Sequence, residues 1–278
     1  MSTIEISKQY IVTGAEHSST GKQLKWQQDG YFYKADRNGF ESLSETLVSR
    51  LLQHSNIEAF AVYEPVMIRY KENTYRGCRS ENFRKEKEEI VSLEHMAKKY
   101  TGFGLAQILE RIADVRERIL YTAELVENVT GLQDFGVYLT KLLEVDAFFL
   151  NTGRDTENIT LLYDTAQDQY CYCPVFDMGD ALFSDTKESC PLEKGMVECY
   201  HSIKARPFSK TFDEQLNTAN ELYGSFLQFD ISAKDMIDMV RDIINDRKDD
   251  VAYEPAEIRR IGEILRFQTR KYQKMFRQ

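Results

Sequence analysis

The sequence contains few of the patterns that would place it among exported or zinc-dependent proteins. Its five cysteines form no disulfide framework, and Cys171 and Cys173 alternate on an expected strand, so that their side chains face opposite ways. This arrangement suits neither a zinc knuckle nor a redox pair, and we expect reduced thiols in a cytoplasmic protein. The four histidines are scattered without His-x-x-x-His or His-Glu-x-x-His spacing, which argues against a catalytic zinc site.

Long apolar runs and a surplus of positive charge are also missing. No segment approaches the roughly 18 uncharged apolar residues of a transmembrane helix, so we expect no membrane association. The N-terminus has no basic patch followed by an apolar run, so we do not expect export. The formal net charge of −9 argues against non-specific nucleic-acid binding by the whole molecule.

The order of the expected elements divides the chain near residues 79–83. Its 278 residues can bury one large core or two modest lobes. Before the division the sequence predicts strands at 10–13, 30–35, 59–70 and 73–78, with one amphipathic helix at 39–54. After it the sequence predicts helices at 85–100, 105–111, 116–129, 132–145, 213–227, 233–246 and 255–277. We therefore predict an α+β fold with a β-rich lobe over residues 1–82 and a larger helical lobe over residues 83–278.

A polar loop and a later acidic turn carry the clearest functional signal. Residues 151–158 read Asn-Thr-Gly-Arg-Asp-Thr-Glu-Asn, two strand-like runs follow, and residues 177–179 read Asp-Met-Gly. In protein kinases an Asn closes the catalytic loop and an Asp opens an Asp-x-Gly turn, and both hold metal ions. Amide and carboxylate oxygens suit Mg²⁺ well. Asn158 could instead be a turn residue and Asp177 a solvated loop acid, but their order and spacing favour the metal site.

Several segments together resemble the HipA-like bacterial serine/threonine kinases, in particular the compact subgroup that lacks an extra N-terminal subdomain. They are Tyr-Lys-Ala-Asp at 33–36, the run from Glu45 to Leu52, residues 151–159, and Pro-Val-Phe-Asp-Met-Gly-Asp-Ala-Leu at 174–182. The resemblance extends from around Gly14 to around Phe208. It implies a protein-kinase-like fold, ATP with Mg²⁺ as phosphoryl donor, and a Ser or Thr hydroxyl of a protein as acceptor.

The resemblance also implies roles for individual residues. Lys34 would contact the α- and β-phosphates and pair with Glu45, while Asn158 and Asp177 would hold the metal. An ammonium fixed by a helix carboxylate is a suitable point charge for phosphates. Lys34 could alternatively be a strand lysine that extends to solvent, and Glu41 competes with Glu45 for the pairing.

Residues 14–23 are expected to form a loop over the phosphates, where small residues let backbone N–H groups approach anionic oxygens. This is not a Walker A loop, because six residues separate Gly14 from Gly21 and Gln23 replaces the Ser or Thr. A plain hairpin loop is the alternative. By the resemblance, Ser18, Ser19 and Thr20 are expected to bind ATP and are candidates for autophosphorylation.

The catalytic loop departs from the family pattern, Asn-x-Asp-Arg-His-x-x-Asn, at the catalytic base. Gly153 stands where that Asp belongs, five residues before Asn158, and Asp155 stands where the His belongs. Asp155 is therefore a tentative base from a shifted position, and Asp146 is a further carboxylate nearby. Because metals and positioning supply most of phosphoryl-transfer catalysis, loss of the base need not abolish activity.

Two functions remain open from the sequence. One is a serine/threonine protein kinase, with autophosphorylation and with activity reduced by Gly153; the other is a pseudokinase that binds nucleotide or a partner. A neutralising or regulatory partner protein, as for a toxin, is expected from family analogy only. The basic segment 259–277 is expected to be a helix docked on the helical lobe, with a docking surface for an acidic partner as the alternative.

Overall fold

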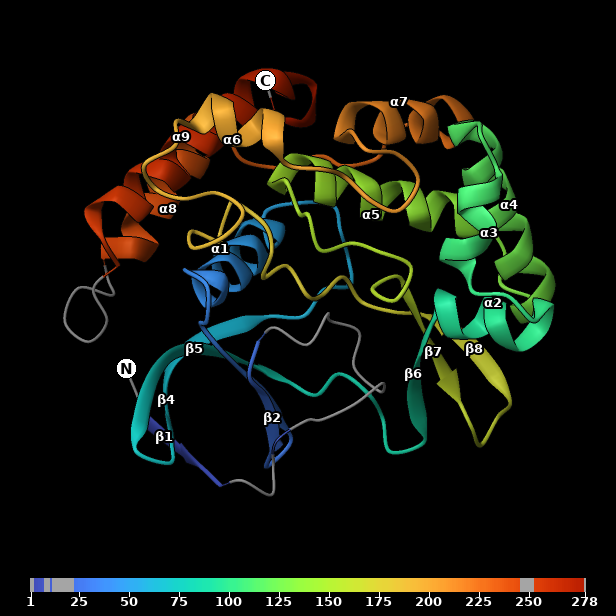
Figure 1. Ribbon diagram of the computed structural model, residues 1–278, viewed down its shortest axis with the longest axis horizontal. Helices are drawn as coiled ribbons and strands as arrows, with labels where there is room; N and C mark the ends of the chain where they lie inside the picture. The colour runs from blue at the N-terminus through green and yellow to red at the C-terminus, as the bar shows by residue number, and fades with distance from the viewer. Residues whose placement is uncertain (1–2, 8–10, 12–22, 246–252, 278) are drawn as a thin grey trace.

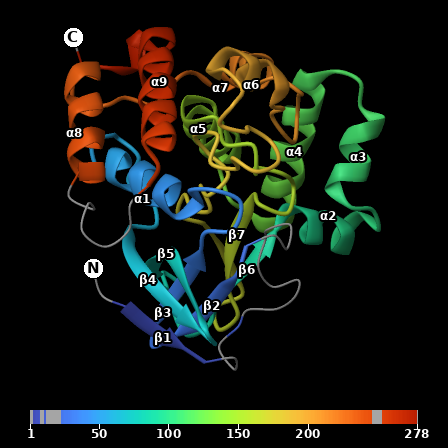
Figure 2. The ribbon, with the colours of Figure 1, turned by 60° about the vertical axis from the view of Figure 1, so that its left-hand side comes forward.

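The computed structural model describes residues 3–7, 11, 23–245 and 253–277, and the statements below concern these residues. They form two regions, a small curved sheet from the first part of the chain and a larger helical region from the rest (Figure 1). Figure 2 shows the same arrangement from the side, with the helices above the sheet. The predicted α+β fold of two lobes is confirmed.

The sheet of the first region has five strands in the order β1-β4-β5-β3-β2. The strands are β1 (Thr3–Ile6), β2 (Lys25–Gln28), β3 (Tyr31–Ala35), β4 (Tyr63–Tyr70) and β5 (Asn73–Glu81). Among the described strands of this sheet, only β1 and β4 pair in parallel. Asp29 and Gly30, both with positive φ, form the tight turn between β2 and β3, which sets Lys25 opposite Lys34.

Helix α1 (Glu41–Leu52) joins the two regions. Every residue of this helix except Arg50 is buried, and its apolar side chains belong to the same core as the helical region. Ser42 Oγ also lies 3.3 Å from Tyr253 Oη, close to the start of the last helix. The small sheet has a separate core around Trp26, Tyr33 and Ile68.

The second region surrounds helix α5 (Phe135–Phe149), which is almost entirely buried. Around it lie α2 (Leu93–Thr101), α3 (Leu105–Arg111), α4 (Val115–Thr130), α6 (Met196–Ser202), α7 (Phe212–Tyr223), α8 (Ala233–Asn245) and α9 (Pro255–Lys271). A second sheet has the order β6-β7-β8, from β6 (Glu88–Ser92), β7 (Thr160–Asp164) and β8 (Gln169–Tyr172). No helix among the described residues is both long and apolar enough to cross a membrane.

Several sequence-based boundaries need correction. The predicted helix at 85–100 is wrong in its first half, because residues 88–92 pair with β7 as strand β6, and the Ser92 side chain then caps α2. The sequence missed β1, β2 and α6, and α9 ends at Lys271 rather than at residue 277. Of the predicted strand at 10–13, only Ile11 lies within the described residues, where it forms a bridge with Trp26.

The basic helix α9 is docked on the helical region, and part of its charge is used there. The Arg260 guanidinium is buried and donates hydrogen bonds to the backbone carbonyls of Cys190, Pro191 and Leu192. Lys271 pairs with Asp213 on α7. These cations therefore tie α9 to its neighbours, which limits the positive charge that the helix presents to a partner.

Candidate active site

Lys34, Glu45 and Asp177 meet between the two regions. Strand β3 contributes Lys34, helix α1 contributes Glu45, and the segment after β8 contributes Asp177. The buried Lys34 ammonium donates a hydrogen bond to Glu45 Oε1 and another, 2.6 Å long, to Asp177 Oδ1. Burial alone would lower the pKa of this ammonium, but the charges of Asp177 and Glu45 outweigh burial and hold the Lys34 pKa well above its usual value. Lys34 is thus charged and fixed, and it does not extend to solvent.

Glu45 also holds the Asp-Met-Gly turn in place. Its Oε2 accepts the backbone N–H of Met178 at 2.9 Å, and the neighbouring Ser44 hydroxyl donates to the Met178 carbonyl at 2.8 Å. Asp177 itself has a φ of 62°, a left-handed conformation that is uncommon for a non-glycine residue. The side chains of α1 therefore stabilise the backbone conformation that presents Asp177.

Glu41 does not compete with Glu45 for Lys34. Its carboxylate accepts the backbone N–H groups of Arg37, Asn38 and Gly39 at 3.2, 2.7 and 3.2 Å, just before α1 begins. The side chain thus closes the turn that leads into the helix. Its role in the structure is to cap this turn, and the pairing with Lys34 belongs to Glu45.

Sequence reasoning missed a second lysine at Asp177. Lys25 lies on β2 directly opposite Lys34, and its Nζ is 3.3 Å from Asp177 Oδ1. Burial lowers the pKa of Lys25, with Asp177 acting in the opposite direction. Burial would raise the pKa of Asp177, but Lys25 and Lys34 hold that pKa well below its usual range. The signal for Lys25 is the pairing of β2 with β3, and the sequence predicts no strand between residues 13 and 30.

A buried ion pair shapes the predicted catalytic loop, residues 151–158. Arg154 Nε lies 2.9 Å from Asp146 Oδ2, and both side chains are almost completely buried. Asp146 also accepts the Asn151 amide at 2.7 Å, while Arg154 donates to the backbone carbonyls of Asn158 and Phe176 at 2.9 and 3.2 Å. Both Asp146 oxygens are therefore occupied inside the protein, which makes Asp146 a structural residue of this loop.

Asp155 and Asn158, two further polar residues of the loop, differ in how their side-chain oxygens are used. Asp155 Oδ1 accepts the backbone N–H groups of Glu157 and Asn158 at 3.0 and 3.1 Å, so it closes the turn, and burial raises its pKa. The Asn158 amide nitrogen donates to the Gly153 carbonyl at 2.5 Å. Its buried Oδ1 has no hydrogen-bond partner among the described residues. That oxygen is available to a cation.

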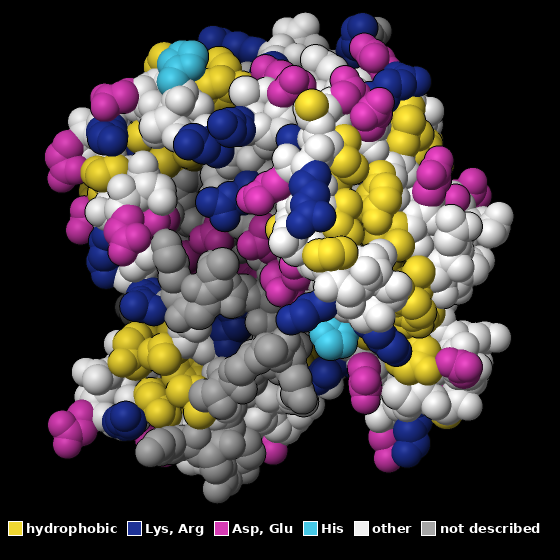
Figure 3. Space-filling view, turned by 45° about the vertical axis from the view of Figure 1, so that its right-hand side comes forward, with side chains coloured by type: hydrophobic (Ala, Val, Ile, Leu, Met, Phe, Trp, Pro, Cys, Tyr) yellow, Lys and Arg dark blue, Asp and Glu magenta, His cyan; other side chains and the backbone are white. Residues whose placement is uncertain are grey.

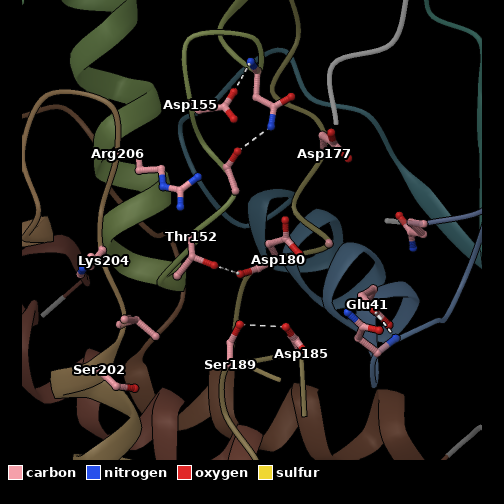
Figure 4. A pocket seen from close by; sticks show the side chains of 16 residues that line it. Glu41, Thr152, Asp155, Asp177, Asp180, Asp185, Ser189, Ser202, Lys204 and Arg206 are labelled. Carbon is pink, nitrogen blue, oxygen red and sulfur yellow. Dashed lines mark hydrogen bonds between the residues drawn. The ribbon is translucent and has the colours of Figure 1, made fainter. Parts of the chain in front are cut away.

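A cavity of about 350 Å³ lies between the catalytic loop, the Asp-Met-Gly turn and the start of α1 (Figure 4). Its lining includes Asn158, Asp177, Gly153, Asp155, Asp180, Glu41, Gln23, Lys204 and Arg206. Figure 3 shows acidic and basic side chains gathered where the surface is hollowed between the two regions. Ser18, Ser19 and Thr20 lie outside the described residues, so their predicted contact with phosphate remains a prediction.

The oxygens at this cavity fit Mg²⁺ better than zinc. No group of three or more His, Cys, Asp or Glu side chains that could hold a metal ion occurs in the described part of the chain. Mg²⁺ instead needs only one or two protein oxygens, because phosphates and water complete its octahedron. Asn158 Oδ1 and the deprotonated Asp177 carboxylate, which line the same cavity, can supply them.

Comparison with known proteins supports the fold. No protein-family model and no curated protein matches the sequence. The structure is similar to the crystal structure of a Helicobacter pylori proinflammatory kinase, CtkA, with a TM-score of 0.59 over 97% of this chain and 94% of that chain. Because the sequence identity is 11%, this similarity shows the fold and does not extend to activity. The protein has a kinase-like bilobal fold.

Proposed function

We propose that the protein is an ATP- and Mg²⁺-dependent serine/threonine protein kinase of the HipA-like type, acting in the cytoplasm. The observation that carries the proposal is the buried Lys34 ammonium, held between Glu45 and Asp177, whose carboxylate lines the cavity. An ammonium fixed in this way is a preformed charge for the α- and β-phosphates of ATP. A second lysine, Lys25, contacts the same Asp177 carboxylate, with its Nζ 3.3 Å from Asp177 Oδ1.

Asn158 and Asp177 would hold Mg²⁺, which supplies positive charge to the transferring phosphoryl group when bound. Asp177 is kept deprotonated by the two lysines, and Asn158 Oδ1 lacks a protein partner. In the proposal Ser18, Ser19 and Thr20 cover the phosphates. One of these hydroxyls is also the first acceptor, through autophosphorylation.

A pseudokinase is the second candidate, and a specific observation favours it. The position five residues before Asn158, which holds the proton-accepting Asp of protein kinases, is Gly153. The tentative base Asp155 uses one carboxylate oxygen to close its own turn. Under this alternative the cavity binds nucleotide, and the protein acts through a partner, such as the neutralising or regulatory protein that the family resemblance implies.

Nucleotide-dependent stabilisation tests the proposal. Saturating Mg²⁺ and ATP should raise the melting temperature of the wild type, because the ligand binds only the folded protein; at 100 times the Kd the stabilisation is about 2.7 kcal/mol. Asp177→Asn should remove the Mg²⁺-dependent part of that shift, whereas Asp238→Asn, a change on the surface of α8, should retain it.

Mass spectrometry after incubation with ATP separates the two candidates. A kinase should carry phosphate on Ser18, Ser19 or Thr20, and a pseudokinase should be stabilised without gaining phosphate. If Mg²⁺ and ATP leave the wild-type melting temperature unchanged, neither candidate holds.

A further inference from the structure

The space beside Gly153 is occupied by the side chain of Asp180. A Cβ atom added at residue 153 would lie 2.7 Å from Asp180 Oδ2, 3.1 Å from Asp180 Cβ and 3.3 Å from Asp180 Cγ. A larger side chain at 153 would therefore have to displace this carboxylate. A glycine at 153 and a carboxylate from residue 180 thus fit together as a pair.

Asp180 is anchored to the catalytic loop through its backbone. Its carbonyl oxygen accepts the backbone N–H of Thr152 at 3.3 Å and the Thr152 hydroxyl at 3.2 Å. Figure 4 shows Asp180 opposite Thr152, between this loop and α1. The next residue is held as well, because the Ala181 carbonyl accepts the Ser44 hydroxyl of α1 at 3.1 Å. The loop and α1 thus fix the backbone on both sides of the Asp180 side chain.

The Asp180 carboxylate is free to interact with a ligand. It lines the cavity, it is exposed to solvent, and it forms no hydrogen bond or ion pair with any other described residue. Asp155, in contrast, already accepts two backbone N–H groups. Of the two carboxylates at this end of the cavity, Asp180 is the one whose oxygens are both available.

The surroundings of Asp180 also suit a group that accepts a proton near neutral pH. Although the side chain is open to solvent, the protein atoms packed around it raise its pKa, and the negative charges of Asp177 and Glu41 raise it further, to about 6. The charged groups that face it are Asp177, Glu41, Asp185 and Lys25, and Lys204 and Arg206 line the same cavity. A base with such a pKa is mostly deprotonated at neutral pH and still accepts a proton readily.

We propose that Asp180 is the general base of this protein and that it replaces the carboxylate missing at Gly153. As the acceptor hydroxyl oxygen forms its bond to the γ-phosphorus of ATP, the bond from that phosphorus to the β–γ bridging oxygen breaks. ADP leaves, and the hydroxyl proton moves to an Asp180 oxygen. This inference rests on the proposed kinase activity and specifies which residue takes the proton from the acceptor hydroxyl.

Moving the carboxylate back to residue 153 provides the sharpest test. Asp180→Asn keeps the shape of the side chain and should lower kcat by about 10²-fold or more, while the Kd for Mg²⁺ and ATP stays within about twofold. Gly153→Asp alone should also lower kcat, because its Cβ displaces Asp180. The double variant Gly153→Asp with Asp180→Gly should regain at least tenfold over Asp180→Asn. Asp238→Asn on the surface of α8 serves as the matched control.

Titration gives a readout that a purely structural role would not change. The wild-type kcat should fall as the pH falls through about 6, because protonated Asp180 cannot accept the hydroxyl proton. In carboxyl-carbon NMR of aspartate-labelled protein without nucleotide, a resonance that titrates near that pH should disappear in Asp180→Asn, whereas the resonance of Asp36, whose pKa burial raises to about 7, should remain. If the fall in kcat near pH 6 is absent from Asp180→Asn while this variant still binds ATP, the assignment of Asp180 as the base is supported.

The outcomes separate this inference from the proposed function. If Asp180→Asn transfers phosphate at the wild-type rate while Asp155→Asn does not, the inference is wrong and the kinase proposal stands with Asp155 as base. If the wild type and the double variant both bind Mg²⁺ and ATP but transfer no phosphate, the inference is wrong and the pseudokinase remains. If the wild type does not bind Mg²⁺ and ATP, the proposed function and the inference both fail.

Discussion

The two ends of the cavity are built in different ways. At the proposed nucleotide end, Asp177 lines the cavity, and short, buried contacts join Asp177 to Lys34 and Lys34 to Glu45, each from a different element. At the acceptor end, Gly153 has no side chain and Asp180 is open to solvent. Under the proposed function, nucleotide binding and phosphoryl transfer therefore rest on separate groups, so that substitutions can change one and leave the other intact.

The largest expected effect is at the nucleotide end. Lys34→Met should weaken binding of Mg²⁺ and ATP by about 10²-fold, because it removes a charge-assisted contact and leaves Glu45 and Asp177 without their cation. Isothermal titration calorimetry measures the affinity, and urea unfolding shows whether the variant is folded. Lys85→Met is the matched control, since the Lys85 side chain is 83% exposed. If a folded Lys34→Met protein binds Mg²⁺ and ATP with unchanged affinity, nucleotide binding does not depend on Lys34 and the proposed contrast between the two ends of the cavity is wrong.

A smaller effect is expected for the second lysine. Lys25→Met should weaken binding of Mg²⁺ and ATP about tenfold, because the Lys25 contact with Asp177 is longer and Lys34 still holds the same carboxylate. The measurement is again calorimetric, with transfer assayed at saturating ATP. If Lys25→Met reduces transfer but not affinity, then Lys25 belongs with the acceptor end instead.

The smallest effect is expected for Asp155. An Asn at 155 can still accept the N–H groups of Glu157 and Asn158, so Asp155→Asn should keep the turn and change kcat by no more than about threefold. The competing hypothesis, that Asp155 is the base, requires a loss of about 10²-fold. A steady-state assay at saturating ATP decides between these values.

Sequence patterns point to Lys34, Glu45, Asn158 and Asp177 because each lies in a local motif, and their role in binding nucleotide and metal stays a prediction. Lys34 and Glu45 flank a strand-to-helix connection, and Asn158 and Asp177 flank a hairpin, so their order along the chain carries the signal. Lys25 could be identified only from the register of β2 against β3, which the turn of two residues between these strands sets. Asp180 could be identified only from its closeness to Gly153 on another loop, and no pattern along the sequence indicates that distance. The predicted helix at 85–100 extends too far because strand β6 leads directly into α2 and gains its pairing from β7, which lies about 70 residues further along the chain.

The burial of α1 has a consequence for regulation. Phe40, Leu43, Leu47, Leu51 and Leu52 are all almost completely buried around this helix. At about 1.5–3 kcal/mol for each large apolar side chain, exposing these five would cost roughly as much as unfolding a typical domain. An inactive state in which α1 rotates outward and separates Glu45 from Lys34 is therefore inaccessible to the folded protein. If the protein is the proposed kinase, we expect inhibition to act on the cavity itself, through a competing ligand, a covering partner or a covalent change near the phosphates.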